Sequence, residues 1–118
     1  MSAPVNAPWP SELRLAPERD RLTLAFDNGE RFTLRAEYLR VESPSAEVKG
    51  HGGGPRLIVT GKEQVKITAL EPVGNYAVRI LFDDGHDSGL YSWDYLYRLG
   101  REEAAIWSAY RAARAAKP

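Results

Sequence analysis

The sequence predicts a single α+β domain made of two β-hairpin and short-helix units, with small antiparallel sheets and a C-terminal helix. Three observations predict this class. Short segments alternate apolar with polar residues, as half-buried strands do. Two Phe-Asp-Asx-Gly sequences, at residues 26–29 and 82–85, mark tight hairpin turns. Residues 101–118 are rich in alanine, which favours a helix. The length of 118 residues fits one domain.

The first unit covers residues 12–41. Alternation within 12–16 and 21–27 predicts two strands that share an apolar face. Asn28-Gly29 predicts a hairpin into the next strand, because Asn-Gly between alternating segments is a strong turn signal. Residues 35–41 predict a short helix. The apolar face of the strands holds Leu13, Leu15, Leu22, Leu24 and Phe26, and that of the helix holds Tyr38, Leu39 and Val41.

The second unit repeats this order. Residues 64–70 and 76–82 predict strands joined by a turn at 72–75, and Asp84-Gly85 predicts a type I′ hairpin turn. Residues 90–99 pass into a helix, which we expect Gly100 to end. In the C-terminal helix, Ile106, Tyr110 and Ala113 form an apolar stripe that Trp107 extends. The two units share Phe-Asp-Asx-Gly, a leucine and Tyr-Leu at matching places, so we interpret them as one supersecondary unit used twice.

Domain boundaries follow from composition. Residues 1–10 hold three of the eight prolines, and we expect a disordered lead from which Trp9 docks on the domain. The folded domain is expected over 11–100, with the C-terminal helix over 101–118. Residues 42–56 carry several glycines and prolines and predict a loop. In that loop Ser43 and Ser45 are expected to hydrogen-bond to the turn made by Pro44.

Charge and cysteine content exclude several classes of function. Sixteen basic residues balance sixteen acidic ones, unlike the basic surface of a nucleic-acid-binding protein. Without cysteine, the chain has no disulfide, thiolate metal site or cysteine nucleophile. No segment has the length and apolarity of a membrane span, and the N-terminus does not have the pattern of a signal peptide. We therefore expect a cytoplasmic domain that binds neither membrane nor nucleic acid.

The second hairpin turn carries the candidate metal ligands. Asp83 and Asp87 flank His86, and imidazole with carboxylates suits zinc or iron. The other histidine, His51, lies in the glycine-rich loop and is needed to complete such a site. Strand geometry argues against a metal site here. Neighbouring residues on a strand point to opposite faces, so His86 and Asp87 should not reach one ion together. A polar turn without metal is the alternative that this geometry favours.

Aromatic residues follow the same turn. Most of them are expected in the core, and those left exposed would mark a surface that binds a protein. The predicted interaction surface consists of Asp84, Tyr91, Trp93 and Trp107.

The segments "EPVGNYAVRI" and "FDDGHDSGLYSWDYL" resemble the gamma-butyrobetaine hydroxylase-like N-terminal domain family, in its stand-alone bacterial form of unknown function. The resemblance covers residues 10–100. In the dioxygenases that this resemblance brings in, the domain holds a zinc ion through three cysteines and one histidine. The cysteine positions correspond here to Ser43, Ser45 and Val48, and the histidine to His86. With three ligands replaced, we do not transfer the zinc site, and we expect no cofactor.

The resemblance also limits the expected activity. The iron and 2-oxoglutarate ligands of the dioxygenases lie in a catalytic domain that this sequence does not contain, so we expect no enzymatic activity. Related domains are attached to iron–sulfur cluster carrier ATPases. We therefore expect a non-enzymatic binding or adaptor domain that serves iron–sulfur or metal-cofactor handling through a protein partner, and a homo-oligomer is a further expectation. The alternative is a zinc- or iron-binding domain with an oxidoreductase-associated role, using His86, His51 and the nearby aspartates.

Overall fold

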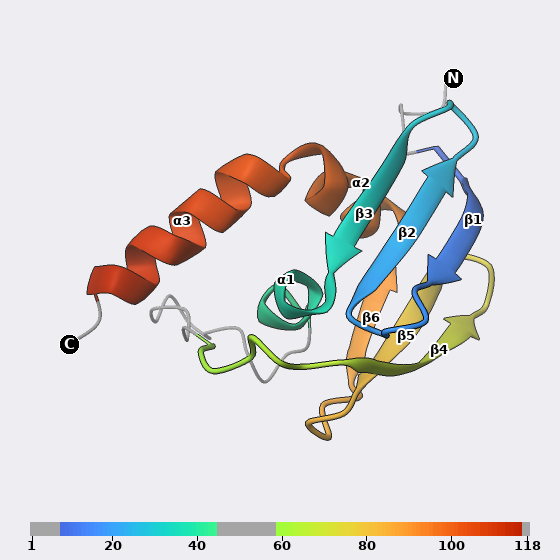
Figure 1. The fold of residues 1–118 in the computed structure, drawn as a ribbon. Coiled ribbons are helices and arrows are strands. Elements are labelled where there is room, and N and C mark those ends of the chain that lie inside the picture. Colours follow the sequence, from blue (N-terminus) through green and yellow to red (C-terminus); the bar gives the residue numbers. More distant parts are fainter. Residues whose placement is uncertain (1–7, 45–58, 117–118) are drawn as a thin grey trace, which may run out of the picture.

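The computed structural model describes residues 8–44 and 59–116, which form two three-stranded antiparallel sheets and three helices (Figure 1). The predicted α+β class is confirmed. The first sheet holds β1 (Pro10–Leu15), β2 (Arg21–Phe26) and β3 (Arg31–Arg35), followed by α1 (Ala36–Val41). The second holds β4 (Ile67–Val73), β5 (Ala77–Phe82) and β6 (Gly89–Ser92), followed by α2 (Trp93–Arg101) and α3 (Glu103–Ala116).

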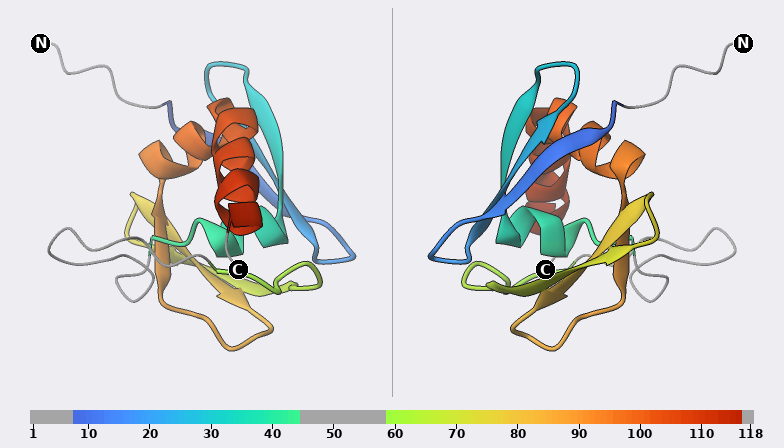
Figure 2. Two further views of the ribbon diagram at one scale, coloured as in Figure 1. Left: turned by 90° about the vertical axis from the view of Figure 1, so that its left-hand side faces the viewer. Right: turned by 90° about the vertical axis from the view of Figure 1, so that its right-hand side faces the viewer.

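The two units have the same order of strand, turn, strand and helix, as the near-repeat predicts. In both views of Figure 2 the sheets lie on different sides of the molecule with α1 between them. Arg19 connects the sheets. Its carbonyl accepts a hydrogen bond from the Ile67 backbone at 2.8 Å, and its guanidinium donates to the Thr68 carbonyl at 2.8 Å. The turn that carries Arg19 is therefore fixed to the start of β4.

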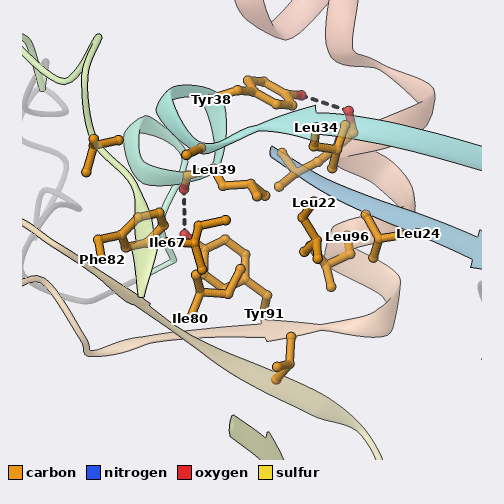
Figure 3. Packing of buried hydrophobic residues seen from close by; sticks show 14 of the residues in the cluster. Leu22, Leu24, Leu34, Tyr38, Leu39, Ile67, Ile80, Phe82, Tyr91 and Leu96 are labelled. Atoms are coloured by element: carbon orange, nitrogen blue, oxygen red, sulfur yellow. Dashed lines mark hydrogen bonds between the residues drawn. The ribbon is translucent and has the colours of Figure 1, made fainter. Parts of the chain in front are cut away.

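The strand alternation places one apolar face of each sheet in a common core (Figure 3). Leu22 and Leu24 are fully buried, and their register partners Leu15 and Leu13 pack at the edge of the core. Truncating one fully buried leucine to alanine typically costs about 2–5 kcal/mol. The fully buried large side chains come from both sheets and from α1 and α2: Leu22, Leu24, Leu34, Tyr38, Leu39, Ile67, Ile80, Tyr91, Leu96 and Leu99.

Both hairpin turns have the same geometry, which differs from the type I′ turn expected at Asp84-Gly85. Gly29 and Gly85 have φ of 90° and 92°, whereas the residue before each glycine has a negative φ. A type I′ turn needs a positive φ at both central residues. The Gly85 N–H donates to the Phe82 carbonyl at 3.2 Å, and the Phe82 N–H donates to the His86 carbonyl at 3.0 Å. These bonds define a three-residue loop that ends in a glycine bulge.

Helix α2 begins as expected and ends later than expected. The Ser92 side chain caps it by accepting a hydrogen bond from the Tyr95 N–H at 3.1 Å. Gly100 does not end the helix, which continues to Arg101. Its role is close packing, because a Cβ at this position would lie 2.5 Å from the ring of Phe32. Glycine therefore allows α2 to lie directly against β3.

Helix α3 lies beyond α1 and extends away from the sheets (Figure 1). Tyr110 is buried and Ile106 is half-buried, as the predicted stripe requires, whereas Ala113 is exposed. The Tyr110 hydroxyl donates to the Val59 carbonyl at 2.6 Å. The Trp107 ring meets Tyr38 edge-on at 5.9 Å between centroids. These contacts attach α3 along one face only.

The N-terminal boundary also differs from expectation. Strand β1 begins at Pro10, inside the predicted disordered lead, and residues 1–7 lie outside the described part of the chain. Trp9 is 54% exposed, so its ring is not buried in the domain, and its carbonyl accepts a hydrogen bond from the Asp27 N–H at 2.8 Å. Among the described helices, none has the length and apolar character needed to cross a bilayer.

Candidate functional site around His86

The second hairpin turn lies against the end of α1, and His86 is the centre of this contact. The His86 Nε2 atom lies 2.8 Å from the Ser43 Oγ atom. Both residues are buried, with His86 7% exposed and Ser43 2% exposed. The imidazole also lies beside the ring of Phe82, at 6.2 Å between centroids. His86 therefore joins the hairpin turn to Ser43, which lies two residues after the end of α1.

Two tyrosines of the second unit make similar contacts. The Tyr91 hydroxyl donates to the Leu39 carbonyl at 2.5 Å, and the Tyr95 hydroxyl donates to the Glu42 carbonyl at 2.5 Å. The last carbonyls of a helix have no partner within the helix, so these hydroxyls stabilise the end of α1. Burial raises the pKa of the Tyr91 hydroxyl above its usual range, so this group stays protonated and donates.

Gly89 is required where β6 passes Ser43. A Cβ at position 89 would lie 2.6 Å from the Ser43 Oγ atom and 3.0 Å from the ring of Tyr91. Contacts this short do not occur between ordinary side chains, so a larger residue would displace Ser43 or the strand. The absence of a side chain at Gly89 thus creates the space that Ser43 occupies.

The acidic residues of the turn differ in their surroundings. Asp84 accepts from Arg40 at 2.8 Å and from Lys62 at 2.7 Å, and its side chain is 18% exposed. Burial alone would raise the pKa of Asp84. The hydrogen bonds from Lys62, the His86 backbone N–H and Arg40 outweigh burial and lower that pKa to about 2. Asp84 is therefore charged at neutral pH and neutralised by two cations.

The predicted metal ligands do not come together among the described residues. His86 is buried, whereas Asp83 and Asp87 are exposed, as the alternation of neighbouring residues predicts for His86 and Asp87. The Asp83 carboxylate accepts from the Lys66 N–H at 3.0 Å. His51 lies outside the described residues. No group of three or more His, Asp or Glu side chains placed to hold a metal occurs within 8–44 and 59–116.

The site offers one arrangement with a chemical precedent, a serine beside a histidine. A nucleophilic serine must be reached by its substrate. In this conformation Ser43 is 2% exposed and lies under the Gly89 backbone. The pair therefore acts as a structural hydrogen bond in the described conformation.

The predicted interaction residues lie in different environments. Tyr91 is fully buried and cannot form part of a surface, which corrects that prediction. Trp93 is half-buried and its Nε1 donates to the Asn75 carbonyl at 2.8 Å. Trp107 is half-buried on α3, away from the hairpin turn. Asp84 is bound internally by Arg40 and Lys62, as described above. Tyr76 and Leu90, which the prediction did not include, are exposed large hydrophobic residues at 55% and 43%.

His86 was predicted as the centre of the site, and the resemblance alone placed Ser43 with it, at two ligand positions of one zinc site. The structure shows Ser43 bonded to His86, 43 positions away. Arg40 and Lys62 carried no motif that indicates Asp84 as their partner. Gly89 offered a usable local signal, because an isolated glycine in a strand indicates close approach of another group.

The family model described as gamma-butyrobetaine hydroxylase-like, N-terminal, matches residues 13–97. No protein with a curated description matches the chain.

Solved structures similar to the chain include two determined in solution by NMR. One is 49% identical, with a TM-score of 0.81 over 100% of this chain and 89% of that one. The other is 44% identical, with a TM-score of 0.79 over 93% of this chain and 86% of that one. A crystal structure from Acidithiobacillus ferrooxidans, of a protein with unknown function in the DUF971 family, is 38% identical, with a TM-score of 0.65 over 77% of this chain and 91% of that one. The matched residues span most of the described fold, and the chain belongs to the gamma-butyrobetaine hydroxylase-like N-terminal domain family.

Proposed function

We propose that this protein is a non-enzymatic binding domain that acts through a protein partner. One observation carries the proposal: His86, the residue in the described chain best suited to catalysis or metal binding, is buried against Ser43 and joins the hairpin to α1. Asp84 is likewise held by Arg40 and Lys62. Because these polar groups serve the fold, the residues that remain for function are those on the surface of the turn.

The surface that we assign to the partner is the exposed side of the second hairpin turn. Asp83 and Asp87 are exposed there, on either side of the buried His86. Arg40 and Lys62 neutralise Asp84, so the charges of Asp83 and Asp87 are those that the turn presents to solvent. A partner with a basic surface patch fits this charge, since complementary charges increase the rate and specificity of association.

The partner that we propose is a component of iron–sulfur or metal-cofactor assembly. Membership of the family supports this choice, and it is an argument by association because a fold alone does not determine function. The domain would contribute recognition, and the partner would carry the chemistry.

The proposal is tested by comparing two charge reversals on exposed turns. Asp87→Lys reverses charge on the assigned surface, and Glu18→Lys is the matched control on the turn between β1 and β2. Tagged wild type and both variants are used to capture partners from the native cell. Each captured protein is then purified and its affinity for the three domains is measured by calorimetry.

We expect wild type and Glu18→Lys to bind a partner that functions in iron–sulfur or metal-cofactor assembly. Asp87→Lys should bind the same partner at least about tenfold more weakly, which corresponds to about 1.4 kcal/mol in binding free energy. Equal affinity of all three domains would contradict the assigned surface. A bound partner that has no connection with metal cofactors would contradict the proposed pathway and leave the binding role intact.

A further inference from the structure

One side of α3 borders a groove that no described residue fills. The groove has a volume of about 550 Å³ and is lined by Glu103, Ala104, Trp107, Ser108, Arg111 and Ala112. These residues lie at helical spacing along one side of the helix. The neighbouring side of α3 is already occupied, since Tyr110 is buried and bonds to the Val59 carbonyl. The groove therefore lies along a face of α3 that the described part of the domain does not cover.

The groove is shaped to accept another helix. Ala104, Ser108 and Ala112 recur every fourth residue and are all exposed. Side chains this small allow a second helix to approach at the short end of the usual interaxial range of about 8–10 Å. Trp107 is half-buried beside this row and is held in place by stacking on Tyr110 at 4.7 Å between centroids. A fixed aromatic ring of this kind commonly anchors an interface.

The charges at the two ends of the groove identify the occupant. Glu103 lies at the first turn of α3 and Arg111 lies eight residues later, about 12 Å along the axis at 1.5 Å per residue. Neither side chain is in an ion pair within the described part of the chain. The groove thus has an acid at one end and a base at the other, with neutral residues between them.

This pattern is complementary to itself when two copies of the helix run in opposite directions. Trp107 lies midway between Glu103 and Arg111, and Ser108 lies midway between Ala104 and Ala112. A two-fold axis between the levels of Trp107 and Ser108 brings Glu103 of each copy within about one residue, about 1.5 Å along the axis, of the level of Arg111 of the other. Ala104 and Ala112 are offset by the same small amount, so small residues lie near small residues across the interface. A parallel arrangement would instead place like charges together. The formal net charge of the chain is +0, so overall charge does not oppose association.

We propose that the groove on α3 is a homodimer interface in which two α3 helices pack antiparallel, with two Glu103–Arg111 ion pairs across the two-fold axis. A helix of this length buries an area at the low end of specific interfaces, so the dimer is weak and reversible. The interface does not include the second hairpin turn, so dimerisation and partner binding are separate properties.

The proposal is tested by sedimentation equilibrium of the full chain from about 1 µM to 1 mM, a range suited to a weak, reversible dimer. Wild type should shift from the 13.2 kDa monomer towards twice that mass. Glu103→Arg and Arg111→Glu each replace two attractive pairs with repulsive ones and should weaken the dimer at least about tenfold. The double variant Glu103→Arg/Arg111→Glu restores opposite charges in the antiparallel arrangement and should recover the dimer.

A steric pair of variants provides the second measurement. Ser108→Trp fills the centre of the groove and should abolish the dimer, whereas Ala109→Trp adds the same ring at an exposed position outside the groove lining and should not. Circular dichroism of each variant confirms that α3 is intact. A monomer at all concentrations would overturn the proposal, as would a dimer that survives both single charge reversals. A double variant that stays monomeric while folded would exclude the antiparallel arrangement and indicate a different occupant.

Discussion

The contact between Gly89 and Ser43 allows a quantitative test of how the hairpin is attached to α1. In the variant Gly89→Ala the new methyl group would lie 2.6 Å from the Ser43 Oγ atom and 3.0 Å from the Tyr91 ring, against ordinary contacts of 3.4–4 Å. Overpacking of this kind costs about 1–3 kcal/mol. Replacing a strand glycine contributes about 0.5–1 kcal/mol in the opposite direction. We therefore expect a net loss of up to about 2.5 kcal/mol in the free energy of unfolding.

Ser43→Ala identifies the cause of that loss. This variant loses the hydrogen bond to His86, at about 0.5–1.5 kcal/mol. It also removes the Oγ atom that the methyl group at position 89 would meet, so Gly89→Ala should cost less in the Ser43→Ala background. The four proteins of this double-mutant cycle are unfolded in urea, and their free energies of unfolding are compared. A coupling energy below about 0.5 kcal/mol would refute the reasoning, because independent sites add within that limit.

Three further variants test other contacts. Hydrogen bonds from Lys62, the His86 backbone N–H and Arg40 lower the pKa of Asp84 to about 2 from 3.8. The stability that Asp84 contributes is therefore present above about pH 4 and is lost as the pH falls from about 4 to 2. Asp84→Asn should remove this component from the pH dependence of the melting temperature. Tyr91→Phe removes the hydrogen bond to the buried Leu39 carbonyl and should lower the free energy of unfolding by about 1–3 kcal/mol, measured in urea; an unchanged value would contradict that bond. Gly100→Ala places a methyl group 2.5 Å from the Phe32 ring and should lower the free energy of unfolding by about 1–3 kcal/mol. In the Phe32→Leu background the same substitution should cost less. An equal loss in the wild-type and Phe32→Leu backgrounds would contradict close packing at this contact.

The sequence predicts those features of the fold that depend on local patterns. Alternating apolar residues placed Leu22 and Leu24 in the core, and Asn28-Gly29 marked the first hairpin. The type of turn was not predicted correctly, because Asx-Gly fits both a two-residue loop and a three-residue loop with a glycine bulge. Gly100 was misread as a helix end because its reason, close packing against Phe32, lies in another element.

In the candidate site, too, local patterns predict some features and miss the contacts between distant residues. His86 is buried and Asp87 is exposed, as the alternation of neighbouring residues predicts, although both lie in the turn before β6. The partners of these residues could not be found in this way. Ser43 meets His86 across 43 positions, and Arg40 meets Asp84 across 44, distances at which sequence periodicity carries no information.

The central claim is that His86 serves the fold through Ser43 and not through a metal. The metal content of the purified protein, together with its melting temperature, tests this claim most directly. Wild type and His86→Ala are analysed for zinc and iron, and wild type is melted with and without a strong chelator. We expect no stoichiometric metal in wild type, a melting temperature that the chelator leaves unchanged, and a lower melting temperature in His86→Ala. One zinc or iron per chain in wild type, lost in His86→Ala and removed by the chelator with a fall in melting temperature, would contradict the account.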